Sequence, residues 1–255
     1  MDEKIFDRIE KKYSLSAADK DALRAIIEKK MKKDSYFESV VYNIYFDTDN
    51  YDLIIQSIDH PMFKEKLRAR SYGGYDKVFL EIKTKIRGFA YRHDLLENDD
   101  TLKDNNLGYK RRVLITHDDY ERLVSGKTTT EILARQKIEE PTDIQIAREI
   151  DYMITHFQLK PKIMIYYNRE SYVDDNGLRI TFDYDLHYRH QNLNFSKKPT
   201  DRTLLSGDHN IIMEIKAHGT MPLWLVHELS ARRLYPMQFS KIGKTYEQLR
   251  KEKNV

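Results

Sequence analysis

Charged side chains recur at every second position in two neighbouring segments of the chain. They are Lys64, Lys66, Arg68 and Arg70 in the first segment and, after a Gly-Gly pair, Glu81, Lys83, Lys85 and Arg87 in the second. Successive side chains of a β-strand point to opposite faces, so residues two apart share a face. If both segments are strands, one sheet face carries many cations and a single carboxylate. Because like charges across a strand pair are destabilising, such a face needs a polyanion to neutralise it.

Three Glu-x-Lys pairs also occur, each spaced so that both side chains share a strand face. The pairs are Glu10 and Lys12, Glu81 and Lys83, and Glu214 and Lys216. Lys and Arg are the usual partners of phosphate oxygens. A carboxylate among them weakens phosphate binding unless it holds a hard divalent cation, and Mg²⁺ is typically bound by one or two carboxylates plus phosphate oxygens. This combination predicts phosphoryl transfer, in which catalysis is mostly positioning and charge stabilisation.

The basic character of the chain is local. The formal net charge is only +3, whereas residues 61–92 contain nine Lys/Arg and three Asp/Glu and therefore carry +6. Such a distribution indicates a site, not a uniformly basic surface. The chain has no cysteine, which excludes disulfides, thiolate metal sites and cysteine nucleophiles.

A hydrophobic content of 40% and a charged content of 33% over 255 residues are typical of a folded globular protein. Without Pro-rich linkers or repeats, we expect a single domain covering residues 1–255. The first residues contain no apolar signal region, and no apolar run approaches the roughly 20 residues of a membrane span. We therefore expect a cytoplasmic protein with no membrane span.

Strand and helix signals alternate along the chain. Ser16 with Asp19 three residues later predicts the start of a helix. The fold class we expect is α+β, with many antiparallel strands around helical insertions, a charged inner sheet face and an apolar outer face packed by helices. Strands are expected at 5–13, 39–48, within 63–88, and at 109–115, 162–173, 178–189 and 210–219; helices are expected at 17–33, within 117–160, and at 222–234 and 240–252.

A series of short motifs follows in a characteristic order. They are R-x-E-x-K-Y at 8–13, NIYFDT, KEKLRARSYG, VFLEIKTKIRG, YKRRV, YNRESY, LRITFDYDL, MEIK and FSKIGK. Together they resemble the VTC domain, the catalytic domain of the vacuolar transporter chaperone polyphosphate polymerase, and its bacterial relatives in the triphosphate tunnel metalloenzyme (CYTH-like) superfamily. The resemblance covers nearly the whole chain.

This resemblance implies a closed, mostly antiparallel β-barrel with helices outside it and a C-terminal helix. The barrel lumen would be a tunnel that binds ATP, triphosphate or inorganic polyphosphate together with Mn²⁺ or Mg²⁺. The implied reaction transfers the γ-phosphoryl group of ATP to a growing polyphosphate chain.

The resemblance also assigns site residues. The catalytic cations implied are Lys12, Arg68, Arg70, Lys83, Arg169, Arg179, Lys216 and Lys241. Lys110 matches a further phosphate-binding lysine of the family, and the alternating charge pattern adds Lys64, Lys66 and Lys85 as phosphate-binding residues. The metal-binding carboxylate implied is Glu214. Glu81 and Glu10 lie in motifs where the superfamily has further acids around the metal.

Two departures from the family pattern affect these assignments. The family usually places a basic residue after the FDT motif, where this chain has Ile55 and Gln56; Lys64 or Lys66 would compensate. About twenty residues, 89–109, are inserted before the YKRRV strand, so the alternative segment GFAYRHD competes with it for the strand position that carries Lys110.

Three other functions use the same features. A tripolyphosphatase or nucleoside triphosphatase would need the same residues, with water as acceptor, and a polyphosphate-binding protein would need them without turnover. A nucleic-acid binder is disfavoured, because the acids at positions 10, 81 and 214 share faces with the cations and would repel a phosphate backbone. The product formed from ATP separates the first two from polymerisation.

Overall fold

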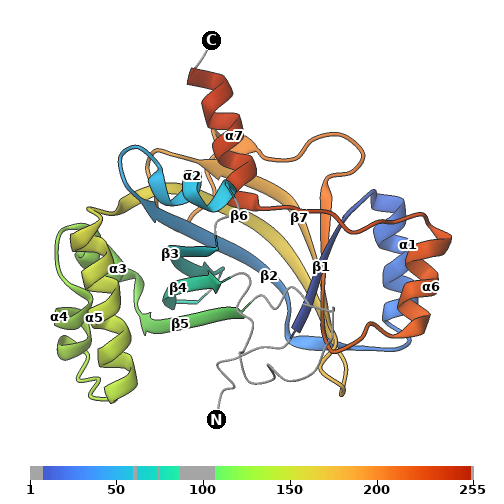
Figure 1. Ribbon diagram of the computed structural model, residues 1–255, viewed down its shortest axis with the longest axis horizontal. Helices are drawn as coiled ribbons and strands as arrows, with labels where there is room; N and C mark the ends of the chain where they lie inside the picture. Colours follow the sequence, from blue (N-terminus) through green and yellow to red (C-terminus); the bar gives the residue numbers. More distant parts are fainter. Residues whose placement is uncertain (1–7, 60–61, 74, 87–106, 254–255) are drawn as a thin grey trace, which may run out of the picture. The chain divides into compact units, whose positions relative to one another are not determined.

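The computed structural model describes residues 8–59, 62–73, 75–86 and 107–253 (Figure 1). These residues form two compact units. Of the described residues, unit 1 comprises 45–59, 62–70, 76–86 and 107–162, and unit 2 comprises 8–44, 71–73, 75 and 163–253. The single-domain organisation expected from the sequence stays a prediction. No helix in the described part of the chain is long and apolar enough to cross a membrane.

Unit 2 is built on an antiparallel sheet. Its strand order is β1-β9-β7-β6-β2, and a short strand, β8, pairs with β7. The strands are β1 (Arg8–Leu15), β2 (Lys32–Asp47), β6 (Lys160–Val173), β7 (Arg179–Arg189), β8 (Arg202–Thr203) and β9 (Ile211–His218), with the last part of β2 and the first part of β6 assigned to unit 1.

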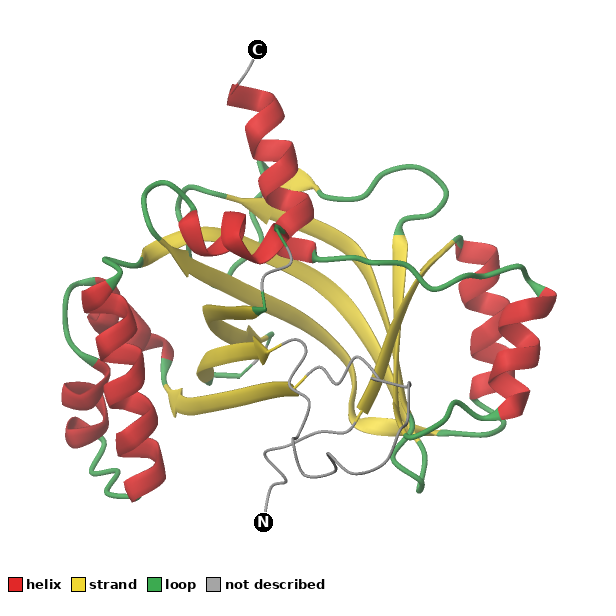
Figure 2. Cartoon of the chain, viewed as in Figure 1, coloured by secondary structure: helices red, strands yellow, loops and turns green. Residues whose placement is uncertain are grey.

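One face of this sheet is apolar and covered by two helices. The helices are α1 (Ala17–Ile27) and α6 (Leu223–Ala231), which lie beside each other against the strands in Figure 2. Their Leu23 and Leu225 join the strand residues Tyr13, Phe182 and Met213 in one buried cluster. The alternation of apolar and charged residues along β7 and β9 thus produces the two-faced sheet predicted from the sequence.

Unit 1 contains strands β3 (Phe63–Tyr72, its last two residues belonging to unit 2), β4 (Val78–Ile86) and β5 (Leu107–Ile115). The strand order continues from the end of β2 through β3 and β4 to β5. Its helices are α2 (Asp52–Ile58), α3 (His117–Val124), α4 (Thr129–Arg135) and α5 (Pro141–His156). The C-terminal helix α7 (Lys241–Lys253) belongs to unit 2.

The predominantly antiparallel sheet with helices confirms the α+β expectation, but the closed barrel is not confirmed. β1 and β5 stand at opposite ends of the strand order, and among the described residues no hydrogen-bonded pairing joins them. Closure stays a prediction from the resemblance.

Several element boundaries differ from the sequence expectation. The helix expected at 17–33 ends at Ile27, and β2 begins at Lys32. The lysines at 29, 30, 32 and 33 repel one another at helical spacing, which disfavours a longer helix. Helix α2 was not expected; its first N–H groups are bound by the buried carboxylate of Asp47, which accepts hydrogen bonds from the backbone N–H groups of Leu53 and Ile54, both at 2.9 Å.

The YKRRV segment forms β5, as the resemblance implied, and pairs with β4 so that Lys110 lies opposite Lys83. The competing GFAYRHD segment and Arg87 lie among residues 87–106, outside the described residues, as does most of the 89–109 insertion.

Candidate functional site

The charged residues of unit 2 form three aligned rows across four strands, which we call the unit 2 face. Antiparallel partners directly opposite each other lie on the same face of a sheet. From β1 through β9 and β7 to β6, the rows are Glu10–Lys216–Arg179–Val173, Lys12–Glu214–Thr181–Ser171 and Ser14–Ile212–Asp183–Arg169. Six residues predicted from the sequence therefore share this face: Glu10, Lys12, Arg169, Arg179, Glu214 and Lys216.

Glu214 lies in the middle row, and its side chain is only 11% exposed. The Nζ of Lys216 is 2.7 Å from Oε1 of Glu214. Burial favours the protonated carboxyl, but Lys216, Lys12 and more distant cations hold the pKa of Glu214 well below its usual range. Glu214 is thus a carboxylate at neutral pH, as a ligand for a hard cation must be.

Lys12 connects this face to the segment before α7. Its Nζ lies 3.3 Å from Oε1 of Glu10 and donates a hydrogen bond to the carbonyl oxygen of Phe239 at 3.0 Å. The carbonyl oxygen of Lys12 accepts a hydrogen bond from the backbone N–H of Met237 at 2.8 Å. The segment that leads into α7 is therefore fastened to β1, next to the face.

Asp183 binds two of the predicted cations. Arg169 donates from Nε to Oδ1 at 2.6 Å and from Nη2 to Oδ2 at 2.8 Å, and the Nζ of Lys241 donates to Oδ2 at 2.6 Å. The Lys241 ammonium also lies 4.6 Å from the centre of the Tyr167 ring. Asp183 is fully buried, which favours protonation, yet Arg169 and Lys241 hold its pKa below the ordinary value.

Arg179 is the most exposed cation of the unit 2 face in contact with a carboxylate. Its side chain is 44% exposed, and its Nη2 lies 2.8 Å from Oδ2 of Asp34 on β2. Its Nε also donates to Oγ of Ser171 at 3.1 Å. The guanidinium is held by two neighbours while keeping an accessible surface, which suits a residue that binds an incoming anion.

Unit 1 carries the second group of predicted residues, arranged around Glu81. Arg68 approaches Oε2 of Glu81 with Nε at 2.7 Å and Nη2 at 2.6 Å, and the Nε of Arg70 lies 3.9 Å from the same oxygen. Glu81 is 1% exposed. Burial favours its protonated form, but Arg68, Arg70 and Lys110 lower its pKa to about 2. Glu81 thus holds the two arginines in place while remaining ionised.

The residues around Glu81 lie on a charged face of β3 and β4, which we call the unit 1 face. The partner strand β5 adds two more cations to it. Lys110 lies opposite Lys83, and Arg112 lies opposite Glu81. Partial burial lowers the pKa of Lys110 to about 8, with Arg112, Arg70 and Arg68 acting in the same direction and Glu81 against them. Lys110 nevertheless keeps exposed surface and stays mostly charged at pH 7. Arg112 was not among the site residues predicted from the sequence, although it follows Lys110 by two positions. Its guanidinium lies 4.7 Å from the centre of the Phe79 ring.

The remaining predicted cations also lie on strands of unit 1. Lys66 on β3 and Lys85 on β4 are half-buried, whereas Lys83 is exposed. Lys64 donates to the carbonyl oxygen of Ser57 in α2 at 3.3 Å. Lys64 thus contacts α2, which contains Ile55 and Gln56, the positions where the resemblance implies a basic residue. Compensation by Lys64 stays a prediction.

The carboxylates fit a cation that is bound together with phosphate. Among the described residues, no group of three or more His, Asp or Glu side chains forms a metal site. Glu10 and Glu214 lie on the unit 2 face, whereas Glu81 is occupied by Arg68. One or two carboxylates suffice for Mg²⁺ when phosphate oxygens supply further ligands. The donor set thus suits a metal–phosphate complex held by Glu214, with Glu10 on the neighbouring row.

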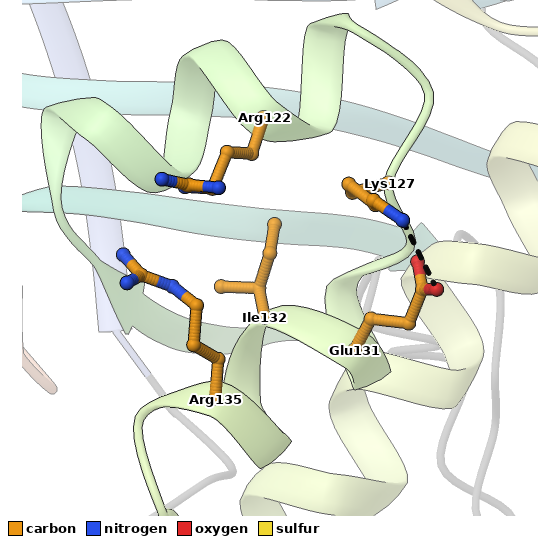
Figure 3. Close-up of a pocket in the computed structure, with 5 residues that line it drawn as sticks. All are labelled: Arg122, Lys127, Glu131, Ile132 and Arg135. Carbon is orange, nitrogen blue, oxygen red and sulfur yellow. Dashed lines mark ion pairs between the residues drawn. The ribbon is translucent and has the colours of Figure 1, made fainter.

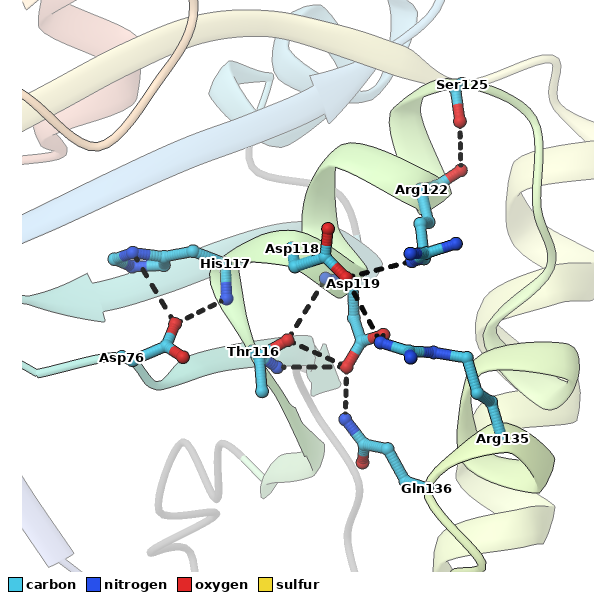
Figure 4. Close-up of polar contacts among 9 residues, drawn as sticks. All are labelled: Asp76, Thr116, His117, Asp118, Asp119, Arg122, Ser125, Arg135 and Gln136. Carbon is cyan, nitrogen blue, oxygen red and sulfur yellow. Dashed lines mark hydrogen bonds and ion pairs between the residues drawn. The ribbon is translucent and has the colours of Figure 1, made fainter.

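A separate pocket lies on the helices α3 and α4 of unit 1 (Figure 3). Its volume is about 200 Å³, and its lining residues are Arg122, Lys127, Glu131, Ile132 and Arg135. Figure 4 shows how the nearby polar groups are paired: Asp118 contacts Arg122 at 2.9 Å and Arg135 at 3.1 Å. Buried Asp119 accepts from the hydroxyl of Thr116, the N-cap of α3, at 2.8 Å and completes a capping box. No predicted site residue lines this pocket, and its polar contacts hold helices together.

We expect Glu81 to make the stability of the protein depend on pH in acid. Its pKa is lowered from 4.5 to about 2 in the folded state, so the unfolded chain takes up this proton first. The stabilisation is complete above about pH 4.5 and is lost as the pH falls towards 2, by about 3 kcal/mol for the single group.

Urea unfolding of the wild type and of Glu81→Gln at pH 6, 4 and 3 checks this expectation. The glutamine variant should be less stable at pH 6, because it leaves Arg68 without its buried partner. The difference between the two proteins should shrink as the pH falls. A difference that stays constant from pH 6 to pH 3 would contradict the assigned role of Glu81.

Three solved structures resemble this chain at low sequence identity. A Bacillus halodurans protein described as an adenylate cyclase is 12% identical over 92% of this chain and 96% of that chain, with a TM-score of 0.47. A Hippeastrum protein described as an adenylyl cyclase with a dominant triphosphatase activity is 15% identical over 92% of both chains, with a TM-score of 0.49. A Pyrococcus horikoshii protein is 14% identical over 96% of this chain and 99% of that chain, with a TM-score of 0.44. Likeness at this level carries no conclusion about activity.

The family comparison is decisive because it covers the sequence almost from end to end. The model of the VTC domain matches residues 7–250. That range includes every predicted site residue, from Glu10 on β1 to Lys241 at the start of α7, and both charged faces. The chain belongs to the VTC domain family.

Proposed function

We propose that this protein is an ATP-dependent polyphosphate polymerase. The observation that carries the proposal is the match of the VTC domain over residues 7–250. The ionised carboxylate of Glu214 among cations on one sheet face supports a metal ion in the site. On a face meant only to attract phosphate, a buried carboxylate is useful only if it holds the cations in place. A face that holds a divalent cation on phosphate oxygens needs one.

In the proposed reaction, a terminal oxygen of the polyphosphate chain attacks the γ-phosphorus of ATP. The bond from that phosphorus to the β–γ bridging oxygen breaks, ADP leaves, and the chain is one phosphate longer. The cations of the unit 2 face bind the phosphates and stabilise the charge on the transferred group. Mn²⁺ or Mg²⁺, held by Glu214 with Glu10, would supply further charge neutralisation on the phosphate oxygens.

The ratio of ADP to orthophosphate formed from ATP tests this proposal in solution. A polymerase given ATP, Mn²⁺ and a short polyphosphate primer produces ADP with little orthophosphate, because the γ-phosphoryl group enters the chain. A hydrolase produces the two in equal amounts, which would overturn the polymerase proposal in favour of a triphosphatase. Orthophosphate without ADP would indicate a tripolyphosphatase acting on the primer, and neither product would leave a protein that binds polyphosphate without turnover.

We also expect tripolyphosphate with Mn²⁺ to stabilise the folded protein. A ligand that binds only the folded state at 100 times its Kd adds about 2.7 kcal/mol. In a chain of this size that corresponds to a rise in Tm of roughly 5–10 °C. Thermal unfolding with millimolar tripolyphosphate, against sulfate at equal ionic strength, measures the effect. An unchanged Tm would contradict phosphate binding by the charged faces.

A further inference from the structure

Asp183 touches two cations of the proposed site but was not itself among the predicted site residues. It lies on β7 in the row that ends at Arg169, and it is fully buried. Its two oxygens receive three hydrogen bonds of 2.6–2.8 Å from Arg169 and Lys241. A carboxylate that binds both in this way fixes the place of each ammonium or guanidinium group.

Lys241 needs such an anchor more than the other cations do. It is the first residue of α7 and comes from the last part of the chain, whereas the other cations of the unit 2 face stand on its strands. The preceding segment is fastened by the contacts of Met237 and Phe239 with Lys12. Asp183 supplies the contact that places the Lys241 side chain itself.

Asp183, and not the proposed metal ligand Glu214, is the carboxylate to which both cations donate the hydrogen bonds described above. Lys241 and Arg169 both help to hold the pKa of Glu214 down, so both act on that carboxylate. Without Asp183, the strongest remaining partner for them on this face is Glu214, and pairing with it would draw them away from phosphate. In the folded protein, Asp183 binds Arg169 and Lys241, whereas Glu214 pairs with Lys216.

We propose that Asp183 is a positioning residue of the unit 2 face, which sets Lys241 and Arg169 in the arrangement that binds the phosphate chain. This inference rests on the proposed function of the face, but its test uses binding without turnover. For a substitution that removes the charge of Asp183, it predicts a change in anion affinity opposite in sign to the change expected from net charge alone. Removing a negative charge from a cationic face should strengthen anion binding unless that charge holds the cations in place.

The test compares two substitutions that remove the same charge from the same face. Metal-free tripolyphosphate binding is measured by calorimetry in EDTA for the wild type, Asp183→Asn and Glu214→Gln. We expect Glu214→Gln to bind several-fold more tightly and Asp183→Asn to bind at least about tenfold more weakly. Asp175→Asn, at an 84% exposed carboxylate paired with Lys32, is the control and should match the wild type. Equal or tighter binding by Asp183→Asn would overturn the proposal.

A second pair of variants covers the case in which Asp183→Asn does not fold. Lys241→Met leaves the Arg169–Asp183 pair intact, and the double variant with Asp183→Asn removes the charge of Lys241 and that of its carboxylate together. Arg169 keeps its anchor in Lys241→Met and loses it in the double variant, so the proposal predicts that the double variant binds tripolyphosphate several-fold more weakly than Lys241→Met. Equal or tighter binding by the double variant, as net charge alone would give, with Tm equal to that of the single variant, would overturn the positioning role.

The outcomes also separate this inference from the proposed function. If the wild type binds tripolyphosphate but forms no polymer, the polymerase proposal fails and the role of Asp183 in binding is still measured. If the wild type forms polymer and Asp183→Asn has an unchanged KM for the primer, the positioning role fails and the polymerase stands.

Discussion

Replacing Glu214 by glutamine should lower ATP turnover by about 10²–10³-fold, the loss typical of removing one preorganised electrostatic group from an active site. Glutamine has nearly the same shape but carries no charge, so it is a poor ligand for Mn²⁺ or Mg²⁺. Glu214 is largely buried and keeps its charge because Lys216 and Lys12 surround it. The loss should therefore be in kcat, with the fold intact.

The same variant should bind metal-free tripolyphosphate more tightly, because the cations around position 214 are no longer partly neutralised. Separating turnover from binding in this way distinguishes a metal ligand from a residue that merely supports the fold. Glu247→Gln is the matched control, since Glu247 pairs with Lys244 on α7 and is 54% exposed. Its turnover should equal that of the wild type. A Glu214→Gln enzyme with more than half of the wild-type kcat would refute the assigned role of this residue.

Truncating Phe182 to alanine should cost about 3–5 kcal/mol of stability, as expected for a fully buried aromatic side chain. Phe182 has no exposed surface and packs in the cluster between the sheet of unit 2 and helices α1 and α6. The edge of its ring faces Tyr172, with the ring centres 6.2 Å apart. The lost area and the cavity left behind act together, and Tm should fall by roughly 10 °C.

Phe182 and Asp183 are adjacent in sequence and lie on opposite faces of β7. The loss of core packing at Phe182 should therefore be separable from the loss of cation contacts at Asp183. Below its lowered Tm, Phe182→Ala should retain turnover within about twofold of the wild type per folded molecule. Leu223→Ala, at a residue 75% exposed on α6, is the control and should change stability by less than about 0.5 kcal/mol. A fall in Tm of less than 2 °C for Phe182→Ala would contradict the position of the core.

The alternation of charged and apolar residues was enough to predict the two-faced strands. Lys64 to Arg70 lie on β3, and Glu81 to Lys85 lie on β4, as the spacing of two requires. The same spacing puts Thr181 and Asp183 on one face of β7 and Phe182 on the other. Strand periodicity depends only on the local sequence, so it can be recognised without knowing which strands pair.

The partners of these strands could not be predicted from spacing. The register that sets Glu214 between Lys12 and Thr181 joins β1 to β9 across some two hundred residues of sequence. The binding of Asp183 to Lys241 depends on where α7 begins and on the segment before it, which no local pattern specifies. The resemblance to the VTC domain identified Lys241 as a site residue, but it did not identify Asp183, the carboxylate that binds Lys241.

Arg112 shows a signal that was present and missed. It follows Lys110 at the spacing already used for β3 and β4, so the strand period of YKRRV would have placed both on one face. The closed barrel is a different case. Closure requires a pairing between the first and last strands of the order, a long-range contact that the period of neither strand encodes.

The most direct measurement is the product formed from ATP by the pure protein with Mn²⁺, separated by gel electrophoresis and stained for polyphosphate. The proposed function predicts a ladder or smear of polymer that grows with time and is absent with Glu214→Gln. Consumption of ATP with orthophosphate as the only phosphate product, and no stained polymer at any time, would contradict it.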